Sequence, residues 1–115
     1  MDLYTETMGG ILLVTPKVER LDALRAPEFR EQMIALVEGK PLVVLDLSQV
    51  QFMDSSGLGS LVAVMKAITE GGQLRIAEPN WMVRNVLRLT RLDRIFHIYD
   101  SVEEASGAHK VARAA

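Results

Sequence analysis

The run Leu42-Val43-Val44-Leu45-Asp46-Leu47 limits the possible folds of this chain more than any other segment. All of its residues except Asp46 are apolar, so neither face of a strand formed here would suit water. Strands that are apolar on both faces lie in the middle of sheets that helices cover on both sides. The run therefore predicts a central strand in an α/β fold.

A helix and a second strand are predicted after this strand. Apolar residues recur there at the spacing of one helical face: they are Leu58, Leu61, Val62, Met65 and Ile68. Gly71-Gly72 ends the helix, and Gln73 to Ala77 form the next strand, with Gln73 and Arg75 expected on its polar side. A strand–helix–strand unit of this kind closes as a right-handed parallel crossover.

The N-terminal part predicts a hairpin followed by a helix. Residues Leu3 to Thr7 and Ile11 to Thr15 are rich in β-branched and large apolar side chains, and Met8-Gly9-Gly10 separates them. Glycine supplies the positive φ that tight hairpin turns require, so the two strands are expected to be antiparallel. A helical face of apolar residues then runs from about Leu24 to Val37, and Gly39 follows it as a helix end.

The C-terminal part predicts a third helix, a short last strand and a fourth helix. Asn80 suits the cap of the third helix, and Ile95 to Ile98 form the strand. Ser101 and Glu104 match a capping box at the start of the final helix. The whole pattern is a mixed sheet of about five strands, with an N-terminal antiparallel hairpin and about four helices. We expect a single domain over residues 1–115, with its core at about 3–106 and a fraying tail at about 107–115.

Composition narrows the class of function. The chain has 115 residues, the length of one ordinary domain, and a formal net charge of -2, whereas a general nucleic-acid binder needs a strongly basic surface. It has no cysteine, which removes disulfides and thiolate metal sites. No apolar run approaches the roughly 18–20 residues that cross a bilayer, and Met1 to Glu6 lack the pattern of a signal peptide. We therefore expect a cytoplasmic protein without metal or cofactor that binds neither nucleic acid nor membrane.

The segment Met53-Asp54-Ser55-Ser56-Gly57-Leu58-Gly59 leads from the buried strand into a helix. Amides at a helix start have no intrahelical partners, and the helix dipole favours negative charge there. Aspartate and serine are leading cap residues, so one interpretation is that Asp54, Ser55 and Ser56 simply cap the helix. The other interpretation is that two serines beside two glycines form a site for a phosphate. These residues alone leave both interpretations open.

This segment, together with Leu21-Asp22 and Val43-Val44-Leu45-Asp46-Leu47, resembles the STAS family. The likeness runs from about Ile11 to Ala105 and is greatest to the stand-alone anti-sigma factor antagonists of bacterial partner-switching systems. It implies the STAS fold and implies that Ser55, the serine after the aspartate, is phosphorylated. It further implies a partner-binding surface with these residues: Leu21, Asp22, Ala23, Asp54, Ser55, Ser56, Gly57, Leu58 and Gly59.

By this resemblance the protein is a binding switch in signal transduction and transcription regulation, and not an enzyme. The unphosphorylated antagonist binds an anti-sigma factor that is also a serine kinase, and this binding releases a sigma factor. The kinase inactivates the antagonist by phosphorylating Ser55, and a phosphatase of the PP2C type removes the phosphate. One alternative is a STAS scaffold or accessory subunit of a signalling assembly or transporter. Another is an enzyme with Ser55 as its nucleophile, although no base has an evident place beside this serine.

Individual residues near these motifs carry further expectations. Asp54 is expected to hold its loop through backbone amides, Leu58 to pack inward, and Leu21 to pack in the core. Glu19 stands where the family usually has glycine, so a backbone with positive φ would be strained there. Arg25 stands where Thr or Asn often caps the first helix, and arginine is a poor cap.

Other candidates are weaker. Five arginines concentrate positive charge around the predicted third helix: Arg75, Arg84, Arg88, Arg91 and Arg94. We interpret this charge as a solvated helix face, with docking of an acidic partner as the alternative. Trp81 and Met82 at the start of that helix are predicted to pack as a lid over the core, with an exposed contact surface as the alternative. His97 and His109 have no carboxylate at ligand spacing, so no metal site is expected.

Overall fold

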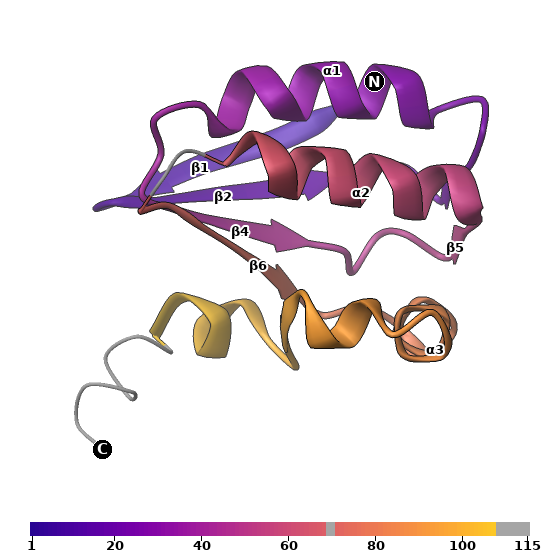
Figure 1. Cartoon of the computed structure of the whole chain (residues 1–115). Coiled ribbons are helices and arrows are strands. Elements are labelled where there is room, and N and C mark those ends of the chain that lie inside the picture. Colours follow the sequence, from indigo (N-terminus) through magenta and orange to yellow (C-terminus); the bar gives the residue numbers. More distant parts are fainter. Residues whose placement is uncertain (69–70, 108–115) are drawn as a thin grey trace.

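The computed structural model describes residues 1–68 and 71–107. A five-stranded sheet forms its centre, and α1 (Ala26–Val37) and α2 (Ser55–Ala67) run next to each other along it (Figure 1). In spatial order the strands are β1 (Leu3–Met8), β2 (Ile11–Pro16), β4 (Leu42–Asp46), β6 (Gln73–Ala77) and β7 (His97–Tyr99). β1 and β2 pair antiparallel, whereas β2, β4, β6 and β7 are parallel. The α/β class, the hairpin and the parallel connection from β4 through α2 to β6 are therefore confirmed.

The hairpin turn uses a glycine where the backbone requires one. Met8 pairs with Ile11, which leaves Gly9 and Gly10 as a two-residue turn. Gly9 has a φ of 62°. This left-handed conformation costs glycine little and suits the twist of a two-residue hairpin.

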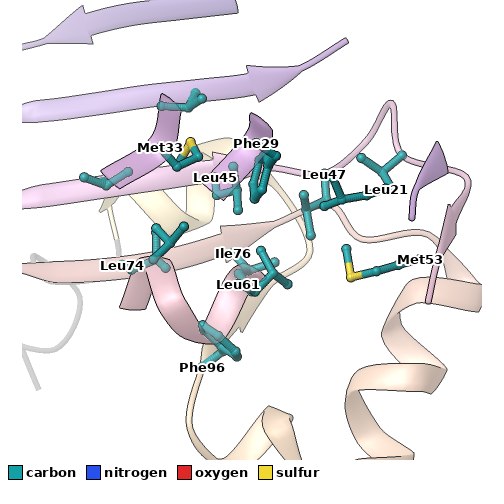
Figure 2. Close-up of a cluster of buried hydrophobic side chains, with 14 of the residues drawn as sticks. Leu21, Phe29, Met33, Leu45, Leu47, Met53, Leu61, Leu74, Ile76 and Phe96 are labelled. Carbon is teal, nitrogen blue, oxygen red and sulfur yellow. The ribbon is translucent and has the colours of Figure 1, made fainter. Parts of the chain in front are cut away.

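Alternate residues of the central strands pack on opposite faces of the sheet. On one face Val43, Leu45 and their neighbours meet the apolar sides of α1 and α2 in the main core (Figure 2). On the other face Val44 packs in a smaller cluster with Ala105, which belongs to a helical segment at residues 102–107. The central strand is thus buried on both faces, as its composition predicts.

Arg75 contradicts the alternation predicted for β6. It is 4% exposed, although the pattern placed it on a polar side. Its Nη1 donates to the carbonyl oxygen of Ala105 at 2.8 Å, and its Nη2 donates to Oε1 of Gln73 at 3.0 Å. Its guanidinium also lies 5.8 Å from the ring centroid of Tyr99. The segment at residues 102–107 covers this face, and a buried charge is tolerated only with such partners.

The C-terminal elements follow the predicted order with one shift. Asn80 caps α3 (Trp81–Leu89), because its Oδ1 accepts from the amide of Val83 at 2.8 Å. A short 3-10 helix, η1 (Leu92–Arg94), follows, and the last strand consequently begins at His97 instead of Ile95. Ser101 caps the final helical segment, since its Oγ accepts from the amide of Glu104 at 3.0 Å.

Two predictions for the C-terminal end fall outside the described residues: the fraying of the tail from residue 108 onward, and the place of His109. Within residues 1–68 and 71–107, none of the helices has the length and apolar character required to cross a membrane.

Candidate functional site

Two short strands bring the segment from Met53 to Gly59 next to the turn at Leu21. β3 (Arg20–Leu21) and β5 (Phe52–Met53) pair in parallel, with Leu21 opposite Met53. The guanidinium of Arg20 lies 4.1 Å from the ring centroid of Phe52 and reinforces this contact. Neither strand was predicted, because two residues are too few to show a period. The pairing joins two loops that are far apart in sequence into one site.

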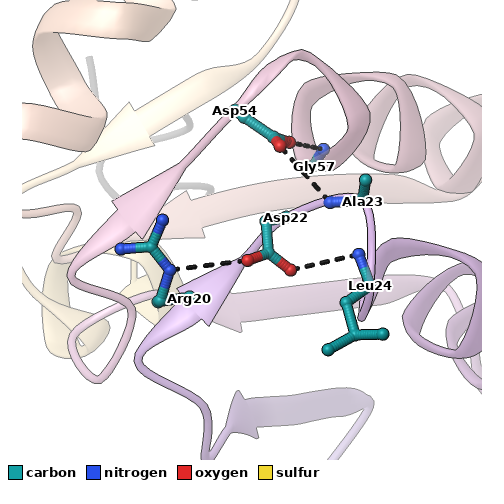
Figure 3. A network of polar contacts seen from close by, with 6 residues as sticks. All are labelled: Arg20, Asp22, Ala23, Leu24, Asp54 and Gly57. Carbon is teal, nitrogen blue, oxygen red and sulfur yellow. Dashed lines mark hydrogen bonds and ion pairs between the residues drawn. The ribbon is translucent and has the colours of Figure 1, made fainter.

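Asp54 holds these two loops together (Figure 3). It is the N-cap of α2, and its Oδ1 accepts a hydrogen bond from the amide of Gly57 at 3.0 Å. Its Oδ2 accepts from the amide of Ala23 at 3.3 Å, 31 residues away in sequence. The expectation that Asp54 holds its loop through backbone amides is confirmed. One carboxylate thus stabilises the helix start and fixes the neighbouring turn against it.

Asp22 organises the turn before α1 in a similar way (Figure 3). Its Oδ1 accepts from the amide of Leu24 at 3.2 Å, and its Oδ2 lies 3.4 Å from Nε of Arg20. Its main-chain oxygen accepts from the amides of Arg25 and Ala26 at 3.0 and 2.8 Å. Arg25 makes no side-chain cap, as expected of arginine. The Asp22 bonds hold this turn in its place.

The strain expected at Glu19 is absent. Among the described residues, the non-glycine residues with positive φ are Glu78 and Arg91, and Glu19 is not one of them. Its carbonyl oxygen accepts from the amides of Gln51 and Phe52 at 2.7 and 3.0 Å. Ordinary backbone therefore forms this turn, and glutamate fits it without strain.

Gly57 permits the close approach of α2 to β3. A Cβ at this position would lie 2.3 Å from the carbonyl oxygen of Leu21 and 2.6 Å from Cγ of Met53. Real Cβ atoms essentially never come within 3.0 Å of another heavy atom, so any side chain here would push the helix away from β3. The fold itself therefore needs this glycine.

Ser55 and Ser56 are the first two residues of α2. Ser55 is exposed and Ser56 is half-buried. The side chain of Asp54 accepts a hydrogen bond from the amide of Gly57, the third residue of α2, and the main-chain oxygen of Asp54 accepts from the amide of Leu58 at 3.0 Å. The amides of Ser55 and Ser56 consequently have no acceptor within the helix. Capping belongs to Asp54, and the two serine hydroxyls are not used for it.

The predicted partner-binding residues divide into a buried set and an accessible set. Leu21 is 0% exposed, Leu58 is 8% exposed, and Gly57 is also buried. The inward packing predicted for Leu21 and Leu58 is confirmed, so these residues support the site from below. The accessible or half-buried residues are Asp22, Ala23, Asp54, Ser55, Ser56 and Gly59.

A surface hollow of about 360 Å³ lies beside Ser56, between the first turns of α1 and α2. Its lining includes Ala23, Arg30, Gly59 and Ser60. Arg30 and Ser60 were not among the predicted site residues. Ser60 is 4% exposed, and its Oγ donates to the carbonyl oxygen of Gly57 at 2.6 Å. Its position one helical turn after Ser56 is the signal that could have revealed it.

The predicted lid at the start of α3 is wrong for Trp81. This side chain is 80% exposed, while Met82 is half-buried and packs against the core. The inward positions of α3 are Val83 and Leu87, which leaves Trp81 on the outer side of the first turn.

The arginines of α3 occupy an exposed face, as the interpretation of a solvated face requires. Nη2 of Arg84 lies 2.8 Å from Oδ1 of Asp100, and Nη2 of Arg88 donates to Oδ1 of Asn85 at 2.6 Å. Arg75 does not belong to this group, since it is buried in β6. His97 is exposed, and the described part of the chain holds no cluster of three or more His, Cys, Asp or Glu suited to a metal ion.

The proteins with similar sequences are named as anti-sigma factor antagonists. An anti-sigma F factor antagonist of Paenibacillus polymyxa is 35% identical over 104 residues, which cover 88% of each chain. A Thermotoga maritima protein, provisionally named an anti-sigma factor antagonist, is 44% identical over 71 residues. That match covers 61% of this chain and 63% of the relative, so it spans less than two thirds of the relative's length.

Solved structures and family models agree with these matches. The crystal structure of a Thermotoga maritima protein with the same provisional name superposes with a TM-score of 0.83, at 32% identity and over 92% of each chain. The model of the STAS domain matches residues 3–105, which include every element of the sheet and the whole site around Asp54. The fold, the site and these matches together show that the chain belongs to the STAS domain family.

Proposed function

We propose that this protein is an anti-sigma factor antagonist whose activity is switched by phosphorylation of Ser55. The observation that carries the proposal is the exposed Ser55 at the first position of α2, beside a cap already supplied by Asp54. The Ser55 hydroxyl is not used to cap the helix, and it is accessible to another protein. The names of the relatives in Paenibacillus polymyxa and Thermotoga maritima support the same role.

The surroundings of Ser55 suit a phosphate without requiring a change of fold. A phosphoserine adds about -1.5 to -2 charges at neutral pH. The two unsatisfied amides and the helix dipole favour that charge by about 0.3–1 kcal/mol. The carboxylate of Asp54 opposes it, because it already brings negative charge to the same helix end. The two effects offset each other, so the phosphate changes the stability of the antagonist little.

The effect on a bound partner is larger. A partner that fits closely over Ser55 would have to remove water from the phosphate or place its own groups against the added charge. A loss of about 3 kcal/mol in binding free energy would weaken the complex more than a hundredfold. The switch therefore works through the interface and not through refolding.

The proposed cycle has three partners. An anti-sigma factor with serine kinase activity binds the unphosphorylated antagonist and releases its sigma factor. The same kinase phosphorylates Ser55 and thereby ends binding. A phosphatase of the PP2C type restores the serine. We propose further that residues 1–115 act as one domain in the cytoplasm and have no catalytic activity of their own.

The experiment is phosphorylation by the anti-sigma factor kinases of the source genome. Each kinase is incubated with the protein and ATP, and mass spectrometry locates the phosphate. We expect it on Ser55 in the parent protein and in Ser56→Ala, and on neither serine in Ser55→Ala. Phosphate on Ser56, or none with any kinase, would overturn the assignment.

Binding measurements test the charge switch separately. Ser55→Ala should retain the affinity of the unphosphorylated protein for the kinase, whereas Ser55→Asp should bind more weakly. Ser56→Asp is the matched control, because it adds the same charge one residue along the helix. Equal affinities for Ser55→Ala and Ser55→Asp would contradict a switch based on charge.

A further inference from the structure

Arg75 carries a buried charge whose partners are all neutral. The residue is 4% exposed, and none of the ion pairs in the part of the chain that the structure describes includes it. Nη1 donates to the main chain of Ala105, while Nε and Nη2 both donate to Oε1 of Gln73, at 3.3 and 3.0 Å. A guanidinium has five N–H donors, so one N–H on each Nη has no acceptor among these residues. Buried charges are normally paired with an opposite charge, because removing them from water is costly.

The carboxylates of the strands on this face of the sheet have other partners. Successive strand pairings place Glu6 three strands away from Arg75, about 14 Å at about 4.8 Å per strand, and its Oε1 accepts from a hydroxyl on its own strand. The two carboxylate oxygens of Asp46 accept from the Thr15 hydroxyl and the Ser48 amide. The sheet therefore supplies no carboxylate to Arg75.

A surface hollow of about 490 Å³ borders Arg75 on the same face of the sheet. Its floor is a row of residues that stand opposite one another in successive strands: Met8, Ile11, Leu42 and Gln73. Arg75 lies two residues along β6 from Gln73 and so points to the same face. Gly9, Gly10 and Pro41 complete the described lining, in which Arg75 is the charged residue. The hollow thus combines a largely apolar floor with one cation, and its volume is in the range of small-molecule sites.

Gln73 occupies the position on Arg75 that a carboxylate would take. Its single carbonyl oxygen accepts from both Nε and Nη2, and this edge of a guanidinium binds a carboxylate through two parallel hydrogen bonds. Gln73 is exposed, so its side chain can turn toward solvent and free this edge. The apolar floor suits a hydrocarbon body, which gains free energy when it leaves water.

We propose that this hollow binds a small organic carboxylate with an apolar body, and that the carboxylate replaces Gln73 on Arg75. The hollow lies at the edge of the sheet where β4 and β6 begin, whereas the chain reaches β5 and Ser55 from the opposite edge (Figure 1). The inference is therefore independent of the proposed function, because a ligand here leaves Ser55 uncovered.

The test titrates ¹⁵N-labelled protein with hexanoate and follows the amide signals by NMR. 1-Hexanol and acetate are the control probes, since the first lacks the charge and the second lacks most of the apolar body. We expect hexanoate to shift the amides of Gly10, Leu42 and Gln73 but not that of Ser55, with an affinity about tenfold or more above either control. Equal affinity for 1-hexanol would refute recognition by Arg75, and an absence of shifts at these three amides would overturn the site.

Variants separate the site from the structural role of Arg75, which itself stays unchanged in all of them. Gln73→Glu supplies a resident carboxylate of the same size, so it should raise Tm and weaken hexanoate binding about tenfold or more. Gly10→Leu fills part of the hollow and should also weaken binding. Its backbone accepts a side chain, because its φ is not left-handed and an added Cβ would meet only Cγ of Pro41, at 3.8 Å.

Ala35→Leu is the matched control for added bulk, since Ala35 is an exposed position on α1, and it should leave hexanoate binding unchanged. An unchanged Tm for Gln73→Glu would mean that the charge of Arg75 already has a partner, which contradicts the premise. Parental affinity for hexanoate in Gln73→Glu or in Gly10→Leu would show that the ligand binds elsewhere. The kinase takes no part in these measurements, so their failure leaves the proposed function untouched.

Discussion

Gly57→Ala is the change that most directly tests how the site is built. The new Cβ would lie 2.3 Å from the carbonyl oxygen of Leu21, about 0.7 Å closer than the 3.0 Å limit of real contacts. A flexible side chain could give way, but this atom belongs to the backbone of β3, which is paired with β5. The first turn of α2 would therefore have to move outward.

The cost of this movement can be estimated from the contacts it disturbs. Overpacking of a tight site costs about 1–3 kcal/mol. Outward movement also weakens the bonds from Asp54 to the amides of Gly57 and Ala23, each worth about 1 kcal/mol. Alanine returns about 1 kcal/mol through its higher helix propensity. The net destabilisation should be about 2–3 kcal/mol, which corresponds to a fall in Tm of about 8–12 °C in a domain of this size.

Urea denaturation followed by circular dichroism measures this change. The midpoint should fall while the slope m stays constant, because the surface exposed on unfolding is nearly the same. Gly59→Ala is the matched control two residues along the helix, where a Cβ meets open space. It should be as stable as the parent or more stable. A midpoint for Gly57→Ala equal to or above that of the parent would refute the reasoning about the contact with Leu21.

Three further predictions concern other residues. Asp54→Ala should destabilise the protein by about 1–2 kcal/mol in the same assay through loss of the cap, and amide exchange at Ala23 should become faster because that amide loses its acceptor. Trp81→Ala should change the unfolding free energy by less than about 0.5 kcal/mol, since the side chain is 80% exposed; a loss of several kcal/mol would mean that it packs on the core after all. The Tyr4 hydroxyl donates to Oε1 of Glu6 at 3.0 Å, and this bond and the carboxylate's charge raise the pKa of Tyr4 above 10.0. Ultraviolet titration of Glu6→Gln should show a lower pKa for Tyr4, because the uncharged amide no longer repels the phenolate and accepts a weaker hydrogen bond; an unchanged titration would contradict that cause.

The elements that the sequence predicted well are those whose pattern is local and long. The run from Leu42 to Leu47 has enough apolar residues to indicate a strand buried on both faces, and β4 lies at the centre of the sheet. The glycines at the hairpin turn and the caps at Asn80 and Ser101 act within a few residues of their partners. Interactions of this range are fully contained in a short stretch of sequence.

The features that the sequence did not predict depend on contacts between segments that are distant in the chain, and such contacts leave no local pattern in the sequence. Arg75 is buried because the segment at residues 102–107 covers its face of the sheet, and Trp81 is exposed because the inward side of α3 begins at Val83. The sequence by itself indicated that Asp54 and Ser55 stand at a helix start. Only the tertiary structure distinguished their roles. The pairing of β3 with β5 brings the amide of Ala23 to the carboxylate of Asp54, so this carboxylate joins the two loops as well as capping α2. The Ser55 side chain takes no part in this contact and is exposed.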